Sequence, residues 1–337
     1  MRTAAWLLTY AATLGWVVDP MLARSRWLRR YPAAGLWLWH GVALGTVAAL
    51  AAGLFLLAHD VAEHGFVWGL NADKALVHDA YASPNEVPAM WNVSLVPLIA
   101  GLGLLGISAV RRWRTARKES LVHRLGVEFR RPVTAAGGRK LFVGIHRSPV
   151  PAIYCVARGS DDQRILATTG ALRVLDEQQL AAAVEHERAH VVGHHHAMKA
   201  LSQAVRSVSR WLGMLRNYPC TVRTLMELHA DDVAARHHGS RTVAAALLQI
   251  GAAGTSSAPP TAASLGGDDL ADRIRRLLNR DANRGGGAAS VIAIGAATAL
   301  FAVPVLCSLI PAMSLAGTAR TSHEDPPSPT PAFAHHP

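Results

Sequence analysis

The residues best suited to catalysis lie in the stretch HERAHVVGHHH, at positions 186–196. His186 and His190 are four residues apart, so on a helix their side chains share one face and can bind one metal ion. Glu187 lies beside the first histidine, close to the metal but not needed to bind it, which suits a general base acting on water. The pattern His-Glu-x-x-His therefore predicts a zinc metalloendopeptidase with one Zn²⁺ per chain.

Two residues could supply the third metal ligand. His196 completes the pattern His-x-x-x-His-x-x-Gly-x-x-His, provided that the helix stops at Gly193. Apolar residues resume a helical rhythm directly after Gly193, which predicts an uninterrupted helix on which His196 points away from the metal. In the stretch MELHADD, Glu227 can reach the metal, and Asp231 one turn later could accept a hydrogen bond from a ligand histidine. We therefore expect Glu227 as the third ligand and keep His196 as the alternative.

The other histidines near the motif have no predicted catalytic role. The run His194 to His196 is interpreted as a polar surface beside the cleft. His229 stays an unassigned residue that could lie near the site.

The elements around the motif predict a mostly helical domain with a small sheet. Short strands are expected at residues 140–149, 151–157 and 164–170. Asp176, with Gln179 three residues later, is typical of a capping box and predicts the start of the helix that carries the motif. Further helices are expected at residues 197–215, 221–239, 240–251 and 268–280.

Four apolar segments predict membrane spans, because half of the chain is hydrophobic and these runs are long. They are residues 3–18, 35–58, 87–110 and 288–317, and the first could instead be cleaved as a signal peptide. The loops after the first and third segments are rich in arginine, which places both termini outside and residues 111–286 in the cytoplasm. We interpret much of the net charge of +11 in this way, and expect no direct binding of nucleic acid.

The expected architecture is a mainly α, four-span protein of the cell membrane with a cytoplasmic zincin domain of the gluzincin-like kind. Its expected parts are a membrane region at 1–118, the peptidase domain at 119–286, a fourth transmembrane helix at 287–317 and a short disordered extracytoplasmic tail at 318–337.

The stretches LDEQQLAAAVEHERAHVVGHHH, LMELHADDVAARHHG and LADRIRRLL resemble the BlaR/MecR-type integral-membrane metallopeptidases. More distantly, they are similar to HtpX-type peptidases. The Glu-x-x-Ala-Asp match at 227–231 is the specific part of the resemblance. The resemblance implies these roles: His186, His190 and Glu227 bind zinc, Glu187 is the catalytic base, and Arg273 is a functional or site-ordering residue.

The predicted function is zinc-dependent hydrolysis of peptide bonds at the cytoplasmic face of the membrane. The substrate is a protein or peptide, which by resemblance could be a winged-helix repressor. Antibiotic-sensing members of the family carry an extracellular penicillin-binding domain after the last span, where this chain has a short tail, so we do not expect β-lactam sensing. The alternative is a non-catalytic membrane receptor or scaffold, but such a protein would have no need of the base Glu187.

Overall fold

The computed structural model describes most of the chain, and its internal contacts divide the chain into two units. The described residues are 2–70, 103, 106–107, 110–111, 127–134, 138, 140–155, 165–254, 267–279 and 287–321. The first unit consists of Met1–Ala12, Leu44–Leu98 and Ala299–Pro337, and the second consists of Thr13–Ala43 and Ile99–Thr298.

The described residues of the first unit belong to three helices, α1 (Arg2–Ala12), α4 (Pro32–Leu70) and α13 (Gly287–Thr321). Leu7, Ala11 and Ala49 form its buried apolar core. The hydroxyl of Tyr10 donates a hydrogen bond of 3.1 Å to the carbonyl of Leu300, which ties α1 to α13. Apolar side chains therefore supply most of what holds these helices together.

Two of the described helices are long and apolar enough to cross a membrane. They are Pro32–Leu57 of α4 and Gly287–Cys307 of α13, with mean hydropathies of 1.9 and 2.2. Both coincide with predicted spans. The first predicted span is helical but is broken into α1, the π-helix η1 (Thr13–Val18) and α2 (Asp19–Ala23). Most of the third predicted span, at 87–110, lies outside the described residues.

The second unit carries a mixed four-stranded sheet in the order β1-β2-β4-β3. Its strands are β1 (Val127–Thr134), β2 (Lys140–His146), β3 (Ile153–Cys155) and β4 (Ile165–Thr168). β2 and β4 are parallel, whereas β1 and β3 are antiparallel edge strands. The sequence predicted β2, β3 and β4 but not β1. It was also wrong about residues 169–170, which begin helix α7 (Thr169–Val174).

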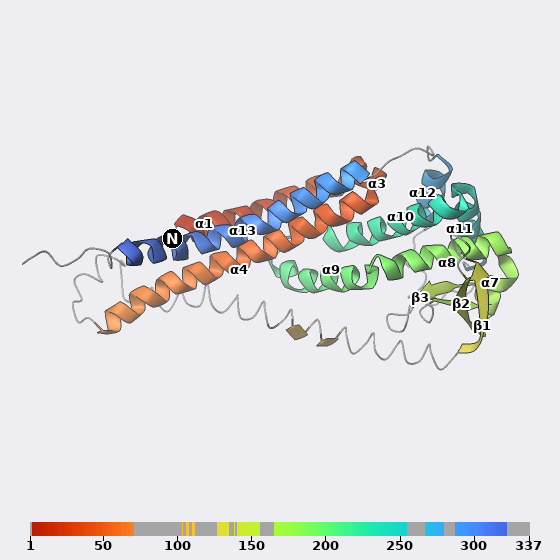
Figure 1. Ribbon diagram of the computed structural model, residues 1–337, viewed down its shortest axis with the longest axis horizontal. Coiled ribbons are helices and arrows are strands. Elements are labelled where there is room, and N and C mark those ends of the chain that lie inside the picture. Colours follow the sequence, from red (N-terminus) through yellow and green to blue (C-terminus); the bar gives the residue numbers. More distant parts are fainter. Residues whose placement is uncertain are drawn as a thin grey trace, which may run out of the picture. The chain divides into compact units, whose positions relative to one another are not determined.

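Six α-helices between Thr169 and Leu278 follow in the described part of the second unit. Figure 1 shows α8 and α10 side by side, with α8 next to the sheet. After α7 they are α8 (Glu177–Val192), α9 (His195–Ser209), α10 (Tyr218–His238), α11 (Ser240–Gly254) and α12 (Gly267–Leu278). Small buried residues such as Ala182 and Ala234 pack with Leu277, so these helices approach closely. The domain is therefore mainly helical with a small sheet, as the sequence predicted.

Local signals explain where α8 begins and where it ends. The predicted capping box is present. The Asp176 carboxylate accepts a hydrogen bond from the backbone N–H of Gln179, and the Gln179 side-chain oxygen accepts one from the backbone N–H of Asp176. The helix then stops at Gly193, and His194 adopts a left-handed conformation with φ of 52°. A new helix starts at His195.

The predicted uninterrupted helix across Gly193 is therefore wrong. A side chain at Gly193 would bring a Cβ atom within 2.7 Å of His195 Nε2 and 2.9 Å of the Ala189 carbonyl oxygen. Glycine permits this close approach. The apolar rhythm after Gly193 belongs to a second helix, and periodicity does not reveal a break of one or two residues.

Candidate metal centre

Two histidines of α8 point to the same place, as the spacing of four residues requires. His186 is buried and His190 is partly buried, and their Nε2 atoms lie 3.2 Å apart. At this distance one nitrogen can donate its N–H to the other, or both can bind one metal ion.

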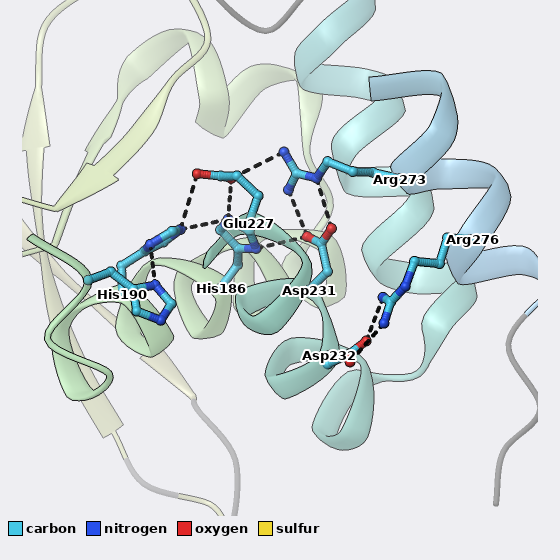
Figure 2. A network of polar contacts seen from close by, with 8 residues as sticks. His186, His190, Glu227, Asp231, Asp232, Arg273 and Arg276 are labelled. Carbon is cyan, nitrogen blue, oxygen red and sulfur yellow. Dashed lines mark hydrogen bonds and ion pairs between the residues drawn. The ribbon is translucent and has the colours of Figure 1, made fainter. Parts of the chain in front are cut away.

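Glu227 reaches this pair from α10 (Figure 2). Its two carboxylate oxygens lie 3.5 Å from His186 Nε2 and 3.7 Å from His190 Nε2. The three candidate ligand atoms all lie within 4.8 Å of one another. Two imidazoles and one carboxylate match the donors that catalytic zinc prefers, with a coordination position left for water or substrate. The donor set therefore fits a zinc ion.

A buried ion pair lies directly behind the ligands. Asp231 is fully buried and its Oδ1 lies 3.0 Å from His186 Nδ1. Arg273 of α12 donates to both oxygens of Asp231, over 2.8 and 2.7 Å, and lies 3.2 Å from the Glu227 carboxylate. Figure 2 shows the Arg273 guanidinium between the two acids. Arg273 thus holds a candidate ligand and the partner of another ligand in fixed positions.

The electrostatics of the pocket favour a cation beside His186. Burial alone would lower the pKa of His186, but its contacts with the accepting carboxylates of Asp231 and Glu227 raise that pKa to about 10. Burial would raise the pKa of Glu227, yet contact with His186 and the charge of Arg273 lower it to about 2. The pocket is therefore built to hold a positive charge against an ionised carboxylate, which is what a metal ion provides.

A second ion pair fixes α12 against α10 outside this pocket. Arg276 donates to both oxygens of Asp232, over 2.7 and 2.9 Å. The adjacent acids Asp231 and Asp232 therefore bind two arginines one turn apart on α12. The sequence motif pointed to Asp231 and Arg273 but gave no role to the outer pair.

His195 is a site residue that the sequence interpretation missed. It is buried, and its Nδ1 lies 2.7 Å from His190 Nδ1. Its Nε2 lies 3.2 Å from His229 Nδ1, so three histidines form a chain that leads away from the candidate ligand. The prediction of a polar surface at positions 194–196 is therefore wrong for His195. The signal that could have revealed it is Gly193, whose missing side chain lets His195 fold back.

His196 lies on α9, after the helix break at Gly193, whereas the candidate ligands His186 and His190 lie on α8 before it. It is exposed, and its Nε2 lies 2.9 Å from the Cys155 sulfur on edge strand β3. It does not belong to the three-residue group that includes Glu227. A helix break at Gly193 therefore exists without bringing His196 to that group.

The side chain of Glu187, on α8, interacts with Cys155 of the edge strand β3. Burial and the charge of Glu227 raise the pKa of Glu187 to about 7, against the opposing effect of His186. Burial and the neighbouring Glu187 carboxylate raise the pKa of the Cys155 thiol. A carboxyl group with a pKa near neutrality can both accept and donate a proton near neutral pH.

Comparison with known families agrees with this geometry. Residues 113–223 match the model of peptidase family M48. The match covers less than half of the chain, and it contains His186, Glu187 and His190 but ends before Glu227. M48 peptidases are zinc-dependent in general, so the match supports a metallopeptidase. No curated protein and no solved structure matches the chain.

Proposed function

We propose that the chain is an integral-membrane zinc endopeptidase with its active site at the α8–α10 pair. The observation that carries this proposal is the meeting of Glu227 with His186 and His190, whose candidate ligand atoms lie within 4.8 Å of one another. Glu227 lies outside the segment that matches family M48, so its position is support independent of that match.

The chain's own groups prepare the ligand nitrogens. Asp231 Oδ1 lies 3.0 Å from His186 Nδ1, a contact that favours the proton on Nδ1 and leaves the Nε2 lone pair of His186 for the metal. His195 Nδ1 accepts the Nδ1–H of His190 in the same way, and His195 then donates its Nε2–H to His229. Zinc bound at this site would supply Lewis acidity, which lowers the pKa of water and polarises a carbonyl group.

Glu187 moves the proton in the proposed reaction. As a carboxylate it accepts a proton from the attacking water, and as a carboxylic acid it returns that proton to the nitrogen of the leaving amine. A pKa of about 7 allows both steps near neutral pH. Glu187 lies on α8 next to His186, so the same helix positions the base and a ligand.

The proposal is tested by zinc content and hydrolysis of casein by the purified protein. Glu187→Gln should keep zinc, because Glu187 is not a ligand, and should lose hydrolysis by about 10²–10⁴-fold. Glu177→Gln is the matched control, since Glu177 lies at the start of the same helix and its side chain is 91% exposed. A wild-type protein that binds zinc but hydrolyses nothing would favour the receptor or scaffold. Equal activity in the Glu187 variant would remove that residue from the mechanism.

The membrane arrangement extends the proposal. Two apolar helices support membrane association. We propose four spans, with the catalytic domain in the cytoplasm and both termini outside, because Arg24, Arg26, Arg29 and Arg30 lie between the first two spans. Reporter fusions after residues 117 and 322 should give opposite sides, and the same side for both contradicts the four-span arrangement.

The identity of the substrate rests on resemblance alone. The similarity to BlaR/MecR-type peptidases suggests regulatory proteolysis of a winged-helix repressor. Co-expression with a candidate repressor should give cleavage products with the wild type and none with Glu187→Gln. Intact repressor in both cases would remove this substrate from the proposal.

A further inference from the structure

The turn between α9 and α10 is bound to the first apolar helical segment of the chain. The backbone N–H of Leu215 donates to the Gly15 carbonyl over 3.1 Å, and Trp16 Nε1 donates to the Leu212 carbonyl over 3.1 Å. A Cβ atom on Gly15 would lie 2.8 Å from Met214 Cγ, so the two segments touch closely. The turn therefore lies level with Gly15 and Trp16, near the end of the first predicted membrane span.

The first turns of α10 also pack on a candidate span. Tyr218 stacks on Trp39 with ring centroids 6.0 Å apart, and its ring meets His40 edge-on at 5.8 Å. Trp39 lies about 10 Å along α4 from Pro32, at 1.5 Å per residue. Because the candidate span begins at Pro32, Tyr218 lies beside a part of α4 that is inside the span.

The second candidate span, in α13, also indicates where the turn lies along the membrane normal. A side chain on Gly41 would collide with Ala297, so α4 and α13 touch at these positions. One to two turns before Ala297, Val291 and Ile292 are 70% and 69% exposed. Exposed apolar side chains on a candidate membrane span suit a lipid environment, so the proposed spans place the bilayer edge near the level of the α9–α10 turn.

The turn itself has the composition of a membrane-interface segment. Residues 195–226 contain five Lys or Arg residues and no Asp or Glu. At the turn, Trp211 is 72% exposed and Leu212 is 47% exposed. The Arg210 guanidinium carbon lies 4.6 Å from the centre of a Trp211 ring, and Arg216 is exposed nearby. Tryptophan and arginine together are typical of the lipid headgroup region.

We propose that the turn at residues 210–217 inserts into the interface of a bilayer that contains anionic lipids. Trp211 and Leu212 contact the acyl boundary, while Arg210 and Arg216 bind lipid phosphates. Glu227 lies about 14 Å further along α10 at 1.5 Å per residue, so the catalytic centre is held close to the membrane surface. Resting on the proposed peptidase function, this placement favours substrates whose scissile bond lies next to the membrane.

A fluorescent probe at Leu212→Cys tests the insertion in the full-length protein in vesicles. The native cysteines, Cys155, Cys220 and Cys307, are first replaced by serine. The Leu212 probe should be quenched by lipids that carry a nitroxide and protected from aqueous iodide. A probe at Arg241→Cys, which is exposed on α11, should show the reverse. Equal iodide quenching at both positions would overturn the proposal.

The charge of the turn supplies a second test. In vesicles with phosphatidylglycerol, Arg210→Glu with Arg216→Glu should weaken lipid contact of the Leu212 probe, by about fivefold for each basic residue removed. The matched pair Arg236→Glu with Arg241→Glu, exposed elsewhere in the domain, should leave it unchanged. An equal effect of both pairs would overturn the role of the turn arginines. If lipid quenches the Leu212 probe but the protein binds no zinc, the proposed peptidase function is overturned while the membrane insertion stands.

Discussion

Removing Arg273 should destabilise the domain far more than removing another arginine of the same helix. The Arg273 side chain is 2% exposed and its partner Asp231 is 0% exposed. Burial would raise the pKa of Asp231, but hydrogen bonds from Arg273 and His186 hold that pKa well below its usual range. Arg273→Met leaves Asp231 as a buried charge without this partner, a defect that costs about 3–5 kcal/mol.

The matched control is Arg275→Met. Arg275 pairs with Asp272 on the same helix, but these side chains are 67% and 57% exposed. Water already solvates such a pair, so its loss should cost less than about 1 kcal/mol. Arg273→Lys should fall between the two, because lysine keeps the charge but not the paired hydrogen bonds.

The assay is thermal unfolding of the metal-free proteins in one detergent, since bound zinc would itself stabilise the folded state. A loss of 3–5 kcal/mol corresponds to a midpoint lower by about 6–20 °C for a domain of this size. Arg275→Met should shift the midpoint by about 4 °C at most. If the two variants melt together, Arg273 is not a buried partner of Asp231 and the reasoning fails.

Three further predictions concern the groups behind the ligands. Asp231→Ala should weaken zinc binding by about 10–100-fold, measured by competition with a chelator, and unchanged affinity would contradict its role. His195→Phe should weaken zinc binding, whereas His195→Asn, which can still accept the Nδ1–H of His190, should recover part of it. Equal affinity in both variants would leave His195 with a packing role only. Gly193→Val should lower the unfolding midpoint and zinc affinity together, by about 1–3 kcal/mol in stability, and a stable variant would show that this turn has room.

The spacing of residues predicted the candidate site better than it predicted the path of the chain. His186 and His190 lie together because a helical interval of four residues leaves little freedom. Asp231 and Arg273 carry opposite charges in buried surroundings, and the structure pairs them. The capping box at Asp176 was predicted from the sequence because both of its bonds form within four residues.

The missed features depend on contacts between distant segments or on single backbone angles. The break after Gly193 rests on one left-handed residue, His194, which leaves the apolar periodicity on both sides intact. The chain from His190 through His195 to His229 joins α8, α9 and α10, and no local pattern encodes it. The absence of strand β1 from the prediction has the same origin, since its partner β2 supplies the pairing.

The most direct test of the account is zinc stoichiometry in Glu227→Ala and His196→Ala, measured by atomic absorption on purified protein. Glu227 contacts both ligand histidines, whereas His196 contacts Cys155 and is not in the group of three candidate ligands. We predict one zinc per chain in the wild type and in His196→Ala, and none in Glu227→Ala. Full zinc in Glu227→Ala with none in His196→Ala would contradict the proposed metal centre.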